Sequence, residues 1–351
     1  MKIKSLISGA MVYGGINIIQ KSITVFLVPI YLAVLSPEEY GSLEIIIAIY
    51  AFFALLFTMQ MEGGFQRFFY DHKNPEKQKL YLSSHLYFIG ITHILGAFIL
   101  LLGSEYINAN LLSSSIGTRY LFILLGLNLL SRCFTTLLLI TLRFKNHKYF
   151  FGIGAITDTI ITSATAVILL VYFEMGIMGI YLGQFIGSFI SNLLMTYRLR
   201  KEIIFNFDFM YVLPSLKYSI YLVPGVMIGW TLAYYNRIFM STSGVELENI
   251  AIFGLANKFS LLIIIALNAL KLVWHPEAIN AIGKKGSNEF YSRVFNYYVA
   301  VMVFAGGIIT IFVKLIINAI APASYSYAAT IAPMLIAATI LNCSVIVTSM
   351  G

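Results

Sequence analysis

The chain opens with MKIKSLISGAMVYGGINIIQKSITVFLVPIYLAVLSPEEYGS, residues 1–42. Two lysines precede a long apolar stretch over 6–35, and an acidic Ser-Pro-Glu-Glu turn follows it. A helix of about 20 apolar residues spans a bilayer, and a signal peptide has a shorter apolar core followed by small residues at its cleavage site. We therefore predict a retained membrane helix over 6–35.

Similar apolar stretches recur along the rest of the chain. With the first, they predict about ten transmembrane helices, over 6–35, 43–65, 82–102, 120–142, 150–173, 177–197, 216–240, 250–274, 294–320 and 328–350. The fold class expected is an all-α polytopic membrane protein.

The basic residues indicate the topology of these spans. Seventeen of the 23 Lys and Arg residues lie at the N-terminus or in every second gap, and the alternate gaps hold only Arg119. Cytoplasmic loops of membrane proteins carry such an excess of basic residues, so the N-terminus and Gly351 are predicted to be cytoplasmic. The seventeen are Lys2, Lys4, Arg67, Lys73, Lys77, Lys79, Arg143, Lys145, Lys148, Arg198, Arg200, Lys201, Lys217, Lys271, Lys284, Lys285 and Arg293.

The composition excludes several classes of protein. Hydrophobic residues make up 59% and charged residues 11% of the chain, whereas soluble domains are about 25% charged. The net charge of +8 resides in short loops next to the membrane, so no nucleic-acid partner is expected. Cys133 and Cys343 lie in separate spans without a CxxC motif. We predict no metal and no cofactor.

A weak internal repeat suggests two halves. Acidic turns follow both the first and the seventh span, at Glu38 and Glu39 and at Glu246 and Glu248. Six spans would separate the copies, which predicts parallel halves. We expect an N-terminal six-helix bundle over 1–205 and a second bundle over 206–351. The second has only four spans and is about 60 residues, or two spans with their loops, shorter than the first.

Polar residues recur at helical spacing within five of the spans, which suggests a shared water-filled interior. Many Ser, Thr and Asn side chains in membrane helices instead bond a neighbouring helix, at ~0.6 kcal/mol on average. The stripes are Asn17, Lys21 and Thr24; Asn128, Arg132 and Thr135; Asp158, Thr162 and Thr165; Gln184, Ser188, Ser191 and Asn192; and Asn257, Lys258 and Asn268.

Charged side chains inside the spans are the candidate site residues. Lys21 and Arg132 lie near mid-span, where a cation costs ~2.5 to 3.5 kcal/mol. Arg237, Lys258 and Lys314 lie toward the external ends, where snorkelling to the interface and a functional role are equally plausible. Their excess over acids argues for an anionic ligand.

Asp158 is the only carboxylate that the sequence places clearly inside a span; Glu62 lies near a cytoplasmic end. Asp158 is a candidate for ion coupling, and the alternative is a static ion pair with Lys21 or Arg132. Arg67, where the second span ends, is a candidate for the cytoplasmic entrance or a plain topological anchor.

Five segments carry a resemblance to Wzx-type polysaccharide flippases of the multidrug/oligosaccharidyl-lipid/polysaccharide exporter superfamily. The family commonly has Asp and Tyr where Asn236 and Asn257 stand here. The segments are Val28-Pro-Ile-Tyr-Leu-Ala-Val-Leu-Ser-Pro-Glu-Glu-Tyr-Gly41; Gly64-Phe-Gln-Arg67-Phe-Phe-Tyr70; Leu142-Arg-Phe-Lys-Asn146; Tyr218-Ser219, Pro224, Trp230 and Asn236-Arg237; and Phe253-Gly254-Leu255-Ala-Asn-Lys258 with Trp274-His-Pro-Glu277.

The resemblance implies two bundles around a central cationic cavity, alternating access and no enzymatic activity. It implies transport of undecaprenyl-diphosphate-linked oligosaccharide, such as the O-antigen of lipopolysaccharide, across the bacterial inner membrane. The implied partners are this lipid, the bilayer and other polysaccharide-assembly membrane proteins. Two alternatives remain: a drug or ion exchanger of the same superfamily, or a membrane-embedded polysaccharide polymerase or ligase.

Overall fold

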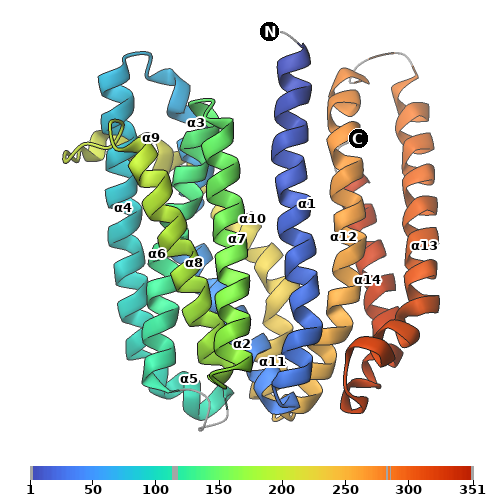
Figure 1. The fold of residues 1–351 in the computed structure, drawn as a ribbon. Coiled ribbons are helices and arrows are strands. Elements are labelled where there is room, and N and C mark those ends of the chain that lie inside the picture. The colour runs from blue at the N-terminus through green and yellow to red at the C-terminus, as the bar shows by residue number, and fades with distance from the viewer. Residues whose placement is uncertain (1–2, 113–117, 282–283, 285, 349–351) are drawn as a thin grey trace. The chain divides into compact units, whose positions relative to one another are not determined.

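The computed structural model describes residues 3–112, 118–281, 284 and 286–348, without the side chains at 3–13, 17–18, 21, 24, 265–281, 288 and 343–348. These residues form helices and no strand (Figure 1). The chain divides into two compact units, Met1–Val245 and Glu246–Gly351. The expected boundary between two bundles at 205 and 206 stays a prediction.

The first unit contains the helices α1 to α11 and the short turns η1 and η2. They are α1 (Ile3–Val34), α2 (Pro37–Thr58), α3 (Met61–Phe68), the 3-10 turn η1 (Phe69–Asp71), α4 (Pro75–Leu102), α5 (Ser104–Leu111), α6 (Arg119–Phe144), α7 (Lys148–Val171), α8 (Gly176–Leu199), α9 (Phe209–Ile220), α10 (Val223–Trp230), the π-helical turn η2 (Thr231–Tyr235) and α11 (Asn236–Thr242).

The motif Ser36-Pro-Glu-Glu39 begins α2 as a capping box. The Ser36 hydroxyl accepts the Glu39 N–H at 3.1 Å, and the Glu39 carboxylate accepts the Ser36 N–H at 2.9 Å. Pro37 occupies the first turn, where its missing N–H costs nothing. The most specific segment of the family resemblance is thus a sharp chain reversal that joins α1 to α2.

Close helix packing holds the first unit together. In Figure 1, α4, α6, α7 and α8 run alongside one another, with α7 packed on α8 and α6 on both α4 and α8. A Cβ atom at Gly183 of α8 would lie 2.5 Å from the Ala166 nitrogen of α7, so only glycine permits this approach. Gly187 approaches α7 equally closely, because a Cβ atom there would lie 2.6 Å from the Thr162 nitrogen.

The second unit consists of α12 (Leu247–Ala281), α13 (Ser287–Ile320), the 3-10 turn η3 (Ala323–Tyr325) and α14 (Ala328–Thr348). Each of the three long helices packs against the other two. Its core includes Leu255, Ile263, Met302 and Ile336.

All ten predicted spans fall on helices, which confirms the all-α polytopic membrane fold. Within the described residues, seven helices are long and apolar enough to cross a membrane, or eight when the bent pair formed by α9 and the helical run after it counts as one. The number ten, and the orientation of the N-terminus, stay predictions.

Two spans expected to be continuous are broken instead. The span 43–65 breaks between α2 and α3, where Met59 and Gln60 adopt left-handed conformations with φ of 48° and 54°. The span 216–240 bends by 52° between α9 and α10. Pro224 explains the second break, because proline lacks an N–H for the helix and clashes with the preceding turn.

The two breaks contact each other within the first unit. The Ser219 hydroxyl at the end of α9 donates to the Gln60 carbonyl at 2.8 Å and accepts the Gly64 N–H at 3.1 Å. A Cβ atom at Gly64 would lie 2.4 Å from the Ser215 carbonyl oxygen. The polar backbone freed at the first break is therefore satisfied by α9, as a membrane interior requires.

Candidate functional site

Arg132 of α6 and Asp158 of α7 form an ion pair within the first unit. The guanidinium Nη1 lies 2.6 Å from the carboxylate Oδ2. The Asp158 side chain is 7% exposed and the Arg132 side chain 35%. Among the described side chains, Arg132 is therefore the partner of Asp158, and part of the Arg132 side chain is exposed.

The second carboxylate oxygen of Asp158 has no hydrogen-bond partner among the described groups. This Oδ1 atom is buried, as is the Thr162 hydroxyl one turn further along α7, which also lacks a partner there. Buried polar atoms are nearly always satisfied, so two unsatisfied ones on the same face of a helix mark an unusual place in the fold.

Helix α1 crosses α7 at the level of Asp158. The Gln20 side-chain amide donates to the Ala155 carbonyl at 3.0 Å and to the Thr159 hydroxyl at 2.8 Å. Lys21 is therefore in α1 next to a residue that contacts the turn containing Asp158. The Lys21 side chain lies outside the described residues.

The polar stripes of α6 and α8 bond each other instead of lining a cavity. The Ser131 and Ser188 hydroxyls are 2.7 Å apart, and the Thr135 hydroxyl donates to Asn192 Oδ1 at 2.9 Å. The Asn128 amide donates to the Tyr181 carbonyl at 2.8 Å. For these two helices, interhelical bonding explains the stripes, and the predicted water-filled interior is not needed.

A second ion pair joins α11 to α2. Arg237 Nε lies 3.4 Å from Glu44 Oε2, and the two side chains are only 5% and 3% exposed. The guanidinium also donates to Asn236 Oδ1 at 2.8 Å and to the Ala233 carbonyl in the π-helical turn η2, and it lies 5.8 Å from the Tyr234 ring centroid. Arg237 therefore does not snorkel; it is buried against an acid.

The sequence analysis missed Glu44, because the predicted span 43–65 places it at the external end. Asp158 is thus not the only carboxylate buried within a span. The signal was present as a lone acid in the apolar run Leu43-Glu-Ile-Ile-Ile-Ala-Ile-Tyr50. An acid in such a run needs a counter-charge, and Arg237 was an available candidate.

Tyr50 and Tyr181 connect the two ion pairs. Their ring centroids are 6.2 Å apart, and the Tyr50 hydroxyl is buried without a partner among the described groups. Tyr50 lies on α2 with Glu44, and the Tyr181 carbonyl accepts a bond from Asn128, one turn before Arg132 on α6. We call the two ion pairs and these two tyrosines the polar region of the first unit, which is formed by α2, α6, α7, α8 and α11.

The remaining predicted site residues lie elsewhere. Arg67 is exposed at the end of α3, 4.0 Å from Asp71 and over the Phe68 ring at 5.3 Å. In the second unit, Lys258 of α12 is half-buried and Lys314 of α13 is exposed. The central cationic cavity, and substrate binding by these three residues, stay predictions.

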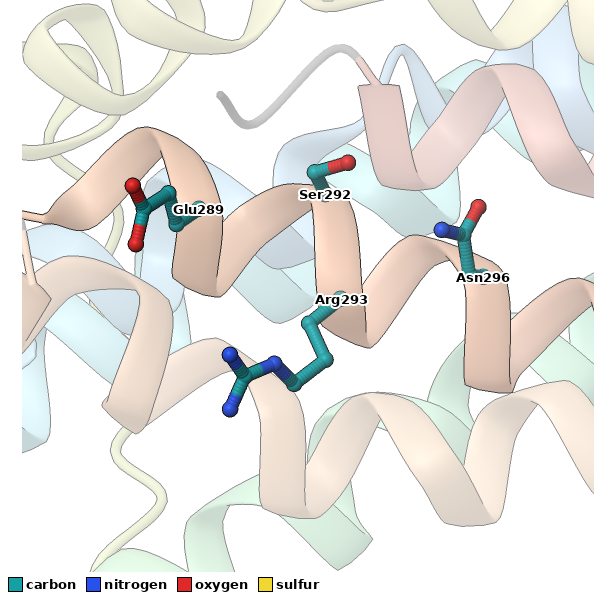
Figure 2. A pocket seen from close by; sticks show the side chains of 4 residues that line it. All are labelled: Glu289, Ser292, Arg293 and Asn296. Atoms are coloured by element: carbon teal, nitrogen blue, oxygen red, sulfur yellow. The ribbon is translucent and has the colours of Figure 1, made fainter.

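A shallow pocket of about 470 Å³ lies on α13 of the second unit, lined by Glu289, Ser292, Arg293 and Asn296. Figure 2 shows the four side chains spread over successive turns, with Arg293 pointing away from Ser292 and Asn296. Since the groups do not converge, the pocket is no candidate site. Within the described part of the chain, no group of three or more His, Cys, Asp or Glu residues is placed to hold a metal.

A scan of protein-family models matches residues 6–278 to the family described as polysaccharide biosynthesis protein. The chain belongs to this family. No curated protein and no solved structure matches it. The matched range contains both ion pairs of the first unit, Arg67 and Lys258, whereas Lys314 and the α13 pocket lie beyond it. Family membership therefore directs attention to the polar region of the first unit.

Proposed function

We propose that this member of the polysaccharide biosynthesis family translocates undecaprenyl-diphosphate-linked oligosaccharide across the bacterial inner membrane by alternating access. The observation that carries the proposal is Arg132, which is held by a buried carboxylate inside an apolar span and has 35% of its side chain exposed. The family match over 6–278 supports the substrate class.

The chemistry of the substrate explains the arginine. A lipid diphosphate cannot enter hydrocarbon without counter-charge, and the planar guanidinium fork suits phosphate oxygens. Asp158 occupies one amino group of Arg132 and orients the guanidinium, while the exposed part remains for the diphosphate. Lys21, beside Gln20 at the same level of α7, is the second cation that we assign to the headgroup.

The same pair supplies a route to ion coupling. A diphosphate that draws Arg132 away leaves Asp158 buried without counter-charge, and such a carboxylate takes up a proton or another cation. Release of the substrate would restore the pair and set the ion free on the side of release, so the ion would cross the membrane together with the substrate. In each transport cycle, Arg132 therefore leaves Asp158 to bind the substrate and returns to Asp158 when the substrate is released.

The charges of the described residues support a drug exchanger less well than a transporter of an anionic lipid. Exchange of cationic drugs needs acids that are free to bind them. Among the described residues, the fully buried carboxylates within spans, Glu44 and Asp158, each pair with an arginine, and the half-buried Glu62 lies near the predicted cytoplasmic end of its span.

The test is transport of labelled undecaprenyl-diphosphate oligosaccharide into proteoliposomes that contain the full chain. We expect transport by the wild type, loss in Arg132→Ala, and partial retention in Arg132→Lys. Arg119→Ala is the matched control, because it removes an exposed arginine from the start of the same helix. Transport of a cationic dye without the lipid would instead support the drug exchanger, and normal lipid transport by Arg132→Ala would refute the role of Arg132.

A further inference from the structure

A second pocket, of about 440 Å³, lies where three spans of the first unit end together. It is lined by the turn between α6 and α7 and by the last turn of α8. Most basic loop residues lie on this side of the spans, the side predicted to be cytoplasmic. The lining residues are Asn146, His147, Lys148, Tyr149, Phe150 and Arg198.

The lining is cationic without a balancing acid. Lys148 and Arg198 belong to it, and neither is paired with a carboxylate in the described chain. The nearby acid, Glu202, is already bound by Lys145 at 2.9 Å. The pocket on α13 is different in kind, because there Glu289 accompanies Arg293. An anion would therefore complete the pocket at the α6–α7 turn.

Arg198 is held in place at this pocket. Its Nη2 donates to His147 Nδ1 at 3.2 Å, and its guanidinium lies 5.2 Å from the Phe150 ring centroid. Burial and then the Arg198 charge lower the pKa of His147, so at neutral pH the imidazole is neutral and accepts this bond. A guanidinium fixed on two sides loses little rotamer entropy when it binds an anion.

Aromatic side chains next to the cations indicate that the anion carries a lipid tail. Tyr149 is 87% exposed and Phe150 39%, at the point where α7 enters the membrane. Tyr197, 66% exposed, lies beneath Arg200 at 4.4 Å on the neighbouring helix end. Exposed aromatics at the ends of spans are typical of the headgroup region, and basic pockets between membrane helices bind anionic headgroups.

We propose that the pocket formed by the α6–α7 turn and Arg198 binds the phosphate headgroup of an anionic membrane phospholipid. Lys148 and Arg198 contact the phosphate, and Tyr149 lies along the part of the acyl chains that is nearest the headgroup. The site goes beyond the proposed transport function and is separate from it, since Lys148 and Asp158 are about 15 Å apart along α7. A bound lipid would fasten the α6–α7 turn and the end of α8 to the bilayer surface.

The experiment is native mass spectrometry of the full chain in neutral detergent, titrated with phosphatidylglycerol or phosphatidylcholine. We expect one phosphatidylglycerol site that is about tenfold tighter than any phosphatidylcholine site, since charge-assisted hydrogen bonds are stronger than neutral ones. Arg198→Gln and Lys148→Gln should each weaken it about tenfold. Lys73→Gln, which removes an exposed lysine between two other spans on the same side, should leave it unchanged.

The other sources of a phosphate group give different results. Displacement of phosphatidylglycerol by millimolar inorganic phosphate would assign the pocket to a free ion. Selective loss of polyprenyl diphosphate binding in Arg198→Gln would assign it to the transported lipid. Either result, or equal retention of both phospholipids by the wild type, overturns the proposal. Having two variants keeps the test valid if one of them fails to fold.

Discussion

The two arginine–carboxylate pairs of the first unit use the same chemistry in different surroundings. Arg237 and Glu44 are both almost completely buried, and the guanidinium has further acceptors on its own helix. Arg132 pairs with an equally buried acid but keeps 35% of its side chain exposed. The first pair has no free side for a ligand, whereas the second does. We therefore propose that the Arg237–Glu44 pair is structural and that Arg132 of the other pair contacts the substrate.

The largest expected effect tests the structural pair. Arg237→Ala breaks the buried ion pair with Glu44, which costs about 3 to 5 kcal/mol. We expect membrane abundance, measured by quantitative immunoblotting, to fall severely, and transport to fall in proportion.

A compensating double variant provides the control for this pair. Replacing both partners by apolar residues, as Arg237→Met with Glu44→Leu, should recover abundance and transport together, because a buried ion pair can be exchanged for packing. Normal abundance combined with lost transport in Arg237→Ala would break the comparison and give Arg237 a place in the transport mechanism.

The second prediction applies the same logic to the exposed pair and expects the opposite outcome. Removing both charges, as Arg132→Gln with Asp158→Asn, should preserve abundance because no buried charge is left unpaired. Transport per molecule should still fall at least about tenfold, since a charge-assisted contact contributes ~1.5 to 3 kcal/mol. Proteoliposome transport normalised to protein amount measures this. Recovery of transport in the double variant would make the two pairs equivalent and remove Arg132 from the substrate site.

The sequence predicted the helices far better than it predicted their continuity. Hydropathy identified ten apolar segments, and each is helical, because the bilayer requires internally satisfied backbone bonds. The breaks at Met59–Gln60 and after Tyr221 were not predicted. Pro224 was a local signal for one, but the other is satisfied by Ser219, 159 residues away in the chain. No local pattern carries that information.

The candidate site shows the same limit. Lys21, Arg132 and Asp158 were identified from their mid-span positions, and the sequence left open which cation pairs with the acid. The structure selects Arg132 through the packing of α6, α7 and α8. Glu44 was overlooked because its burial depends on α11 packing against α2. The bond between Arg237 and Glu44 joins residues 193 positions apart in the chain.

The third prediction concerns the acid alone. Asp158→Asn nearly preserves shape and removes the charge, and the remaining Arg132 is less buried than Arg237. We expect abundance to fall modestly and transport to persist at a reduced rate without dependence on a pH gradient. Substrate-coupled proton flux in proteoliposomes should disappear. Normal flux in this variant would exclude Asp158 from coupling and leave it only as the static partner of Arg132.

The smallest expected effect is at Arg67, which belongs to neither ion pair. The Arg67 side chain is 58% exposed beside Asp71. Because water screens an exposed charge, a contact between Arg67 and the substrate contributes under about 1 kcal/mol. Arg67→Lys keeps the topological charge but loses the planar fork that suits phosphate. If Arg67 guides the diphosphate toward the interior, transport should fall a few-fold at unchanged abundance.

Arg200→Lys, at another exposed arginine beyond the end of α8, is the matched control. Equal transport by both variants would reduce Arg67 to an anchor, because a lysine serves as well as an arginine wherever only the charge matters.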